Sequence, residues 1–294
     1  MRFLYLLVIC FFFQISNCFS QAEITDLKFN KKYFQAIDEW VVFPKKEKDS
    51  TYLYGFIYVD QTAGFTFNVE SSFQIKKGKF IVKEDSLKGT YYIKHRLDSK
   101  YNKLNLAILN KLQLEVLNLP RSPKWLEGYN TNKSSVAFLK NIGYQLNHVG
   151  ASEEAITYLL KAYDIDPKFK GLYFELSFAY NATRQFEKAK SILLEAINYD
   201  SERLLYYKEL MFSYMNLRNN SEAEKATLKG LSLKGEDDIK AEMALNMTSV
   251  FFNLKEYNSF EKWLLITKKY QTTNASIKAY VNTFERELEK IKNN

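Results

Sequence analysis

The feature that most constrains the fold of this 294-residue chain is a period of 34 residues in its C-terminal half. Small residues and large apolar residues both recur at this spacing. Three series carry the pattern: Ala155, Ala189 and Ala223; Ala162, Ala196 and Gly230; and Ile142, Leu176 and Leu210. A fixed period of 20 to 50 residues indicates a supersecondary unit that repeats along the chain.

Each period has the pattern of two antiparallel helices. In residues 170–203, apolar side chains follow helical spacing from Leu172 to Tyr180, and again from Phe186 to Ala196. The polar stretch 181–185 between them predicts a turn. Pro167 closes the preceding unit, and no proline follows it, as an array of stacked helices requires.

This pattern resembles the tetratricopeptide repeat over residues 136–274. The predicted units are 136–169, 170–203, 204–237 and 241–274, with a capping helix at 275–292. The residues at the family's key places are Gly143, Ala155, Ala162 and Pro167; Leu176, Tyr180, Phe186, Ala189 and Ala196; and Leu210, Tyr214, Ala223 and Gly230. The fourth unit departs from the family, with Phe260 and Thr267 where small residues belong.

The resemblance implies a helical solenoid that binds protein segments in a concave groove lined by the first helix of each unit. The lining residues implied by position are Lys140, Tyr144, Phe174, Phe178, Asn181, Lys208, Phe212 and Met215. Tyr144, Phe178 and Phe212 occupy equivalent places and form a predicted aromatic ladder. Glu175 and Glu209 stand where some relatives bind a C-terminal carboxylate, which argues against that ligand. Alternatively, the ladder packs against the N-terminal domain of the same chain.

Residues 21–134 predict a second, β-rich domain, so the predicted fold class is α+β. Residues 51–83 read as an antiparallel meander, with further strands at 40–43 and 90–97 and a helix at 108–117. This domain carries a net charge of +6 out of +8 for the whole chain. Lys76, Lys77 and Lys79 form a basic patch at a hairpin tip, either facing an anionic polymer or lipid surface or simply keeping an edge strand soluble.

The first 20 residues predict export. Arg2 precedes an apolar run of 11 residues, too short to span a bilayer, and we expect cleavage after Ser20. A lipoprotein anchored through Cys18 and a buried N-terminal helix are the alternatives. Both cysteines lie in this segment, and no later apolar run is long enough to span a membrane. These features predict a periplasmic or secreted bacterial protein, possible association with the cell envelope, and no nucleic-acid partner.

The sequence offers little for catalysis. It has two histidines, His95 and His148, without ligand-spaced companions, and no recognisable nucleophile or phosphate-binding motif. We therefore expect no catalytic residues, no metal and no cofactor. The leading hypothesis is an exported, non-catalytic scaffold that binds a protein or peptide. One alternative is glycan or small-ligand binding by the β-rich domain, with the repeats as support, and another is a hydrolase.

Overall fold

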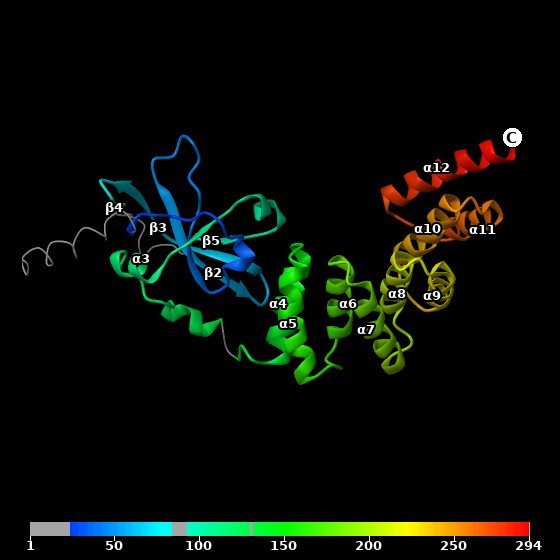
Figure 1. Ribbon diagram of the computed structural model, residues 1–294, viewed down its shortest axis with the longest axis horizontal. Helices are drawn as coiled ribbons and strands as arrows, with labels where there is room; N and C mark the ends of the chain where they lie inside the picture. The colour runs from blue at the N-terminus through cyan, green and yellow to red at the C-terminus, as the bar shows by residue number, and fades with distance from the viewer. Residues whose placement is uncertain (1–23, 84–92, 130–131, 294) are drawn as a thin grey trace, which may run out of the picture. The chain divides into compact units, whose positions relative to one another are not determined.

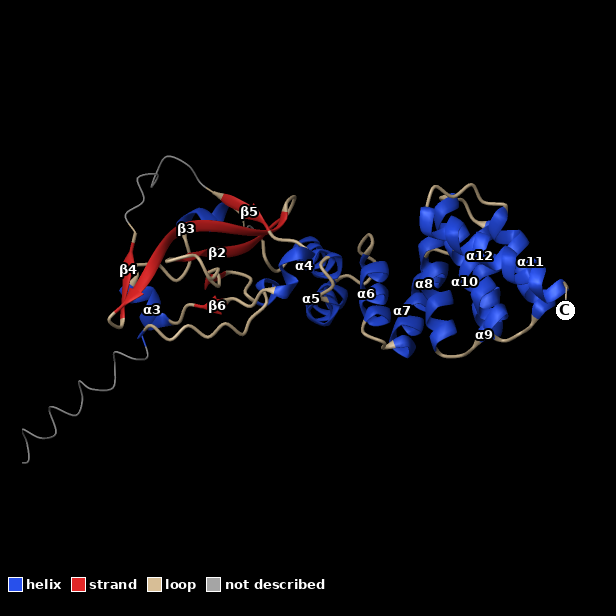
Figure 2. Ribbon diagram, turned by 90° about the horizontal axis from the view of Figure 1, so that it is seen from above, coloured by secondary structure: helices blue, strands red, loops and turns tan. Residues whose placement is uncertain are grey.

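The computed structural model describes residues 24–83, 93–129 and 132–293 (Figure 1). The chain divides into two compact units, Met1–Ala151 and Ser152–Asn294. The described strands all lie in the first unit, and the second is built of helices, which confirms the predicted α+β class (Figure 2). The predicted export segment, 1–20, lies outside the described residues. Within the described part of the chain, no helix has the length and apolarity needed to cross a membrane.

The first unit is built on one antiparallel sheet. Its strands are β1 (Glu39–Val42), β2 (Tyr52–Asp60), β3 (Gly64–Lys76), β4 (Lys79–Val82), β5 (Lys94–Arg96) and β6 (Ala107–Ile108), with order β4-β3-β2-β1-β6. β5 pairs with β3 beside Thr66–Asn68, and β4 pairs with Phe73–Lys76. The meander predicted over 51–83 is therefore confirmed. Of the strand predicted at 90–97, residues 90–92 lie outside the described part.

The long β2–β3 hairpin is fixed by its turn and by one bulge. The Asp60 carboxylate accepts hydrogen bonds from the backbone N–H groups of Thr62 and Ala63, both at 2.8 Å. The register shifts between Tyr54 and Gly55. A Cβ atom added to Gly55 would lie 2.1 Å from the carbonyl oxygen of Asn68, so only glycine lets the strands approach this closely.

An aromatic cluster forms the core on one face of the sheet. Trp40, Phe56 and Tyr58 are almost fully buried there, and the Trp125 ring meets Phe56 at 5.9 Å and Tyr58 at 5.1 Å. The buried Trp40 donates its indole N–H to the carbonyl oxygen of Pro120 at 2.7 Å. This bond satisfies the indole N–H, which is the one polar group of the buried Trp40 side chain.

The helix predicted at 108–117 is shorter in the structure, where α3 spans Lys111–Val116. Ala107 and Ile108 instead form β6, which pairs with β1. The helix begins where a capping box allows it: the Asn110 side chain accepts from the Gln113 N–H, and Gln113 accepts in return from the Asn110 N–H, both at 2.9 Å. The described part of this unit also holds three short 3-10 helices: η1 (Tyr33–Gln35), η2 (Ser99–Lys103) and η3 (Lys124–Gly128).

The described helices after residue 135 follow the predicted pairs. They are α4 (Val136–His148), α5 (Ser152–Ile165), α6 (Leu172–Ala182), α7 (Phe186–Tyr199), α8 (Leu204–Asn216), α9 (Asn220–Ser232), α10 (Asp237–Asn253), α11 (Tyr257–Lys268) and α12 (Ala275–Lys292). α4 belongs to the first unit, where Asn102 donates to the carbonyl oxygen of Val149 at 2.9 Å, just beyond its end. α12 matches the predicted capping helix.

The turn between the two helices of each pair has the same geometry four times. Gly150, Arg184, Arg218 and Lys255 all have positive φ, between 59° and 80°. In each turn, the backbone N–H after this residue bonds to a carbonyl five positions earlier, as in Gln185 to Tyr180 at 2.8 Å. This is the bond that closes a Schellman motif, so the repeat extends to backbone geometry.

Small residues at the 34-residue positions let neighbouring helices of the second unit approach. Ala189, Ala196 and Ala223 are completely buried. A Cβ atom on Gly230 would lie 2.6 Å from the terminal methyl of Met243 and 3.2 Å from Cβ of Tyr207. Helix α9 therefore lies against both α8 and α10 at this glycine, which explains why alanine is not found there.

Candidate protein-binding face

The first helices of units two to four, α6, α8 and α10, are neighbours in the second unit. Their exposed side forms what we call the first-helix face, made by Phe174, Phe178, Lys208, Phe212, Met215 and Glu242. Phe178 and Phe212 are 36% and 41% exposed at equivalent places, whereas Phe174 and Met215 are half-buried. The Phe174 ring lies 6.2 Å from Phe178, and Phe186 of α7 lies 6.2 Å from Phe212. Two large aromatic side chains are thus held on neighbouring helices with a substantial part of each ring in solvent.

Asn181 lies beneath this face rather than on it. Its side chain is 4% exposed and joins α6 to α8. The amide nitrogen donates to the backbone carbonyl oxygen of Glu209 at 3.1 Å and to its carboxylate at 2.9 Å, while the amide oxygen accepts from the Ser213 hydroxyl at 2.8 Å. With its donor and acceptor both used inside the protein, Asn181 holds the two helices together.

The first-helix face and the residues beneath it carry charged groups of both signs. Lys208 Nζ lies 2.9 Å from a carboxylate oxygen of Glu242 on α10. Glu175 and Glu209 are both 7% exposed. Burial raises the pKa of the Glu209 carboxyl, the negative charges of Glu242 and Glu175 raise it further, and the Asn181 hydrogen bond and the Lys208 charge oppose the shift. Glu242 and Glu175 therefore lie close enough to act on the Glu209 carboxyl.

Lys140 and Tyr144, the other two predicted groove residues, lie on α4 in the first unit. Tyr144 is 41% exposed, with the Lys140 ammonium 5.5 Å from its ring centre and the His148 ring stacked at 6.1 Å. The buried side of α4 faces the sheet, because a Cβ atom on Gly64 would lie 2.6 Å from the Gln145 amide oxygen. Of the predicted ladder, Phe178 and Phe212 share one compact unit and Tyr144 belongs to the other.

The three lysines of the predicted basic patch surround the β3–β4 turn. Lys76 and Lys79 are directly opposite each other, and Lys77 and Gly78 form the turn with φ of 48° and 70°. All three lysine side chains are exposed. Two consecutive positive φ values are typical of the tight turn that suits a β-hairpin. The patch therefore exists as a cluster at a hairpin tip.

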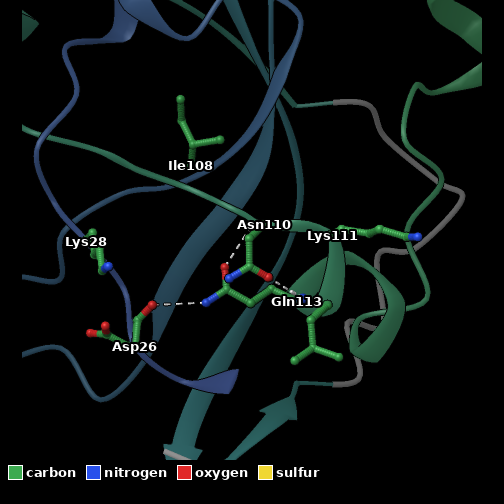
Figure 3. A pocket seen from close by; sticks show the side chains of 7 residues that line it. Asp26, Lys28, Ile108, Asn110, Lys111 and Gln113 are labelled. Atoms are coloured by element: carbon green, nitrogen blue, oxygen red, sulfur yellow. Dashed lines mark hydrogen bonds between the residues drawn. The ribbon is translucent and has the colours of Figure 1, made fainter. Parts of the chain in front are cut away.

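Two pockets lie in the first unit, both beside α3. The larger, of about 550 Å³, is lined by Asp26, Lys28, Ile108, Asn110, Lys111, Leu112 and Gln113. Figure 3 shows Gln113 reaching toward Asp26, to whose backbone oxygen it donates at 3.0 Å. The second, of about 450 Å³, contains Glu39, whose pKa burial raises and the Arg121 charge lowers.

The ionisable groups that line these two pockets are carboxylates, lysines and one arginine. The lining residues include no serine, cysteine or histidine, and the carboxyl groups that line the pockets are those of Asp26, Glu39 and Glu115. Across the described residues, no group of three or more His, Cys, Asp or Glu side chains could hold a metal ion.

The model of the family described as "Tetratricopeptide repeat" matches residues 171–203, the second helix pair. Residues 171–203 therefore form a tetratricopeptide repeat. The sheet of the first unit is not part of that family's fold. No curated protein matches the chain.

Two solved structures resemble part of this chain. One is TTC0263, a thermophilic tetratricopeptide repeat protein in Thermus thermophilus, with 16% identity and a TM-score of 0.45 over 59% of this chain and 89% of that one. The other is named "MamA MSR-1 C2", with 14% identity and a TM-score of 0.40 over 60% and 87% of the two chains.

The sequence reasoning missed two residues that belong to the first helices, Ser213 and Glu242. Nothing in the 34-residue pattern marks Ser213 as the partner of Asn181, because the bond joins different repeats. It also missed a row of exposed leucines at one register of the second helices. These are Leu160, Leu194, Leu228 and Leu265, between 37% and 55% exposed. This row could have been read from the sequence, since three of its members are 34 residues apart.

Proposed function

We propose that this protein is an exported, non-catalytic tetratricopeptide repeat scaffold whose first-helix face binds a segment of another protein. The observation that carries the proposal is the pair Phe178 and Phe212. Both rings are held by folded helices at the same register, and both keep more than a third of their surface in solvent. Partly exposed aromatic side chains on a rigid support are the usual anchors of protein–protein interfaces.

Fixed helices favour binding because little ordering is needed. The Asn181 bonds fix α6 against α8, and the Lys208–Glu242 ion pair links α8 to α10. A partner therefore meets a preformed surface, and its binding energy is not spent on arranging the helices. The export part of the proposal rests on the N-terminal sequence alone, and the mass of the mature chain tests it: loss of residues 1–20 is the expected result.

Binding is tested by capture from an envelope extract with full-length mature protein as bait. We expect a discrete partner to be retained by the wild type and lost with Phe178→Ala/Phe212→Ala. The matched control is Leu194→Ala/Leu228→Ala, which removes apolar side chains of similar exposure from the second helices. Equal capture by all three proteins would rule out the first-helix face as the binding surface.

A second candidate is binding of a small polar ligand by the first unit. The pocket of about 550 Å³ beside α3 favours it, since Asp26, Lys28 and Lys111 give it groups of both charges. The aromatic rings of the sheet core are buried, so they offer no stacking platform for a sugar. Thermal-shift screening of the full chain against small polar solutes tests this function, and a Lys111→Ala variant should lose any shift.

A further inference from the structure

The two faces of the sheet differ at its outer end, where β4 lies beside β3 (Figure 2). On one face, Phe73 and Phe80 are buried in the aromatic core. Side chains alternate along a strand, so the residues next to these point to the opposite face. Ile81, which follows Phe80, is 48% exposed, and Leu53, which precedes the buried Tyr54, is 39% exposed. The face opposite the aromatic core therefore presents aliphatic side chains to solvent.

Lysines surround these two aliphatic side chains. Lys79 and Lys83 lie two positions on either side of Ile81, so all three share one face. Lys76 is directly opposite Lys79. Ser72 pairs with Leu53 on one side and accepts a hydrogen bond from the Lys83 N–H on the other, so Leu53 and Lys83 belong to one row across the sheet. We call this surface the lysine face, made by Leu53, Lys76, Lys79, Ile81 and Lys83.

The positive charge of the lysine face is available to a partner. Residues 73–83 contain four lysines and no acidic residue, a net charge of +4. The side chains of these lysines are exposed, and none of them forms an ion pair with a carboxylate of the described residues. A cluster of like charges without counter-charges produces a potential that attracts ligands of the opposite sign.

We propose that the lysine face binds the surface of an anionic lipid membrane. The ammonium groups would lie among the phosphate headgroups, and Ile81 and Leu53 would enter the boundary between headgroups and acyl chains. These two side chains favour lipid over a soluble anionic polymer, because a polymer offers negative charge without an apolar layer. The inference concerns the first unit and does not depend on protein binding by the first-helix face of the second.

Vesicle flotation of the full-length mature protein tests the binding. The probes are vesicles of phosphatidylglycerol and phosphatidylcholine in equal amounts, vesicles of phosphatidylcholine alone, and soluble dextran sulfate. We expect the anionic vesicles to bind the protein, less tightly as salt screens the charges, and the neutral vesicles not to bind it. One lysine near an anionic surface changes the affinity about fivefold, so Lys76→Ala/Lys79→Ala should bind about 25-fold less tightly. The control Lys161→Ala/Lys278→Ala removes the same charge from exposed positions of the second unit and should bind as the wild type does.

A single introduced cysteine tests the contact with lipid. Both native cysteines lie in residues 1–20, so a chain that begins at Gln21 has none. Ile81→Cys then gives one position for a polarity-sensitive fluorophore, whose emission should shift to the blue when anionic vesicles are added. The same label at Leu254→Cys, 47% exposed in the second unit, should not shift. Because both native side chains are exposed, unchanged circular dichroism is expected for both variants.

The outcomes decide between a membrane surface and the alternatives. Absence of binding to the anionic vesicles, or equal binding to both kinds of vesicle, would overturn the inference and leave the lysines as protection of an edge strand. Binding to dextran sulfate without binding to vesicles would assign the face to an anionic polymer. Equal loss of affinity in the two double variants, or no emission shift at position 81, would also contradict the inference.

Discussion

The bond network of Asn181 predicts a large and local loss of stability when its amide is removed. In Asn181→Ala, the Glu209 carboxylate loses its 2.9 Å donor and the Ser213 hydroxyl loses its 2.8 Å acceptor. The hydroxyl keeps a second acceptor, the backbone oxygen of Glu209 at 3.0 Å. The carboxylate is 7% exposed, so water cannot readily replace the lost donor.

The expected cost follows from these contacts. A hydrogen bond to a charged group contributes about 1.5–3 kcal/mol, and a neutral one about 0.5–1.5 kcal/mol. The two lost bonds together give about 2–4 kcal/mol. We therefore expect Asn181→Ala to lower the free energy of unfolding of the second unit by about 2–4 kcal/mol. Adding Glu209→Gln should recover part of this loss, because the buried group is then neutral.

Hydrogen exchange read by peptide mass measures this loss in the second unit alone. Peptides from α6 and α8 should exchange faster in Asn181→Ala at neutral pH. Asn216→Ala is the control, because this exposed side chain bonds to the carbonyl oxygen of Phe212 in its own helix. A free energy of opening in Asn181→Ala within about 1 kcal/mol of the wild-type value would refute the assigned role of the amide. A double variant that is less stable than Asn181→Ala would refute it as well.

Three further predictions concern stability. Folding raises the pKa of Glu209, so its favourable contribution to the free energy of unfolding is present below the unfolded pKa and is lost as pH rises through the folded pKa. Urea titrations should therefore show Glu209→Gln gaining stability relative to wild type from about pH 4 to pH 7. A difference that stays constant with pH would contradict this. Arg184→Gly with Arg218→Gly, at φ of 61° and 59°, should stabilise the protein by about 1–2 kcal/mol in thermal unfolding, and a lower midpoint would contradict the strain argument. Gly55→Ala should lower the free energy of unfolding by at least about 3 kcal/mol, because the added Cβ would clash with the Asn68 carbonyl oxygen. The near-ultraviolet signal of the aromatic residues reports this loss of packing, and a wild-type spectrum and unfolding midpoint would refute the prediction.

The helical half of the fold was predictable because one period repeats several independent signals. Small residues, apolar residues and turns share one register. An ambiguous helix boundary in one unit can therefore be fixed from the equivalent positions of the next unit. The β2–β3–β4 meander was predictable from alternation and from the turn residues at 60–64 and 76–78. These are local features, and local features survive in the folded protein when the hydrophobic pattern agrees with them.

The start of α3 was not predictable in this way. Residues 108–117 read as one apolar helical stretch, but Ile108, together with Ala107 before it, pairs with β1. A strand of two residues has no periodicity to detect. The capping box of Asn110 and Gln113 was the local signal that the helix begins later.

The binding face likewise has some features that the sequence predicts and others that it does not. The equivalent places of Phe178 and Phe212 follow from the period, and both side chains are exposed. The burial of Asn181 depends on Glu209 and Ser213, which lie in the next repeat and become partners only when α6 packs on α8. The Lys208–Glu242 ion pair likewise joins two repeats, and the insertion before α10 hides its register in the sequence.

Site-specific photocrosslinking in the native host tests the central claim most directly. A photoreactive phenylalanine analogue replaces either Phe212, 41% exposed on the first-helix face, or Leu194, 42% exposed on α7. The account predicts a discrete protein adduct from position 212 and none from position 194. Adducts from position 194 with none from position 212 would contradict it, because the partner would then bind the second helices.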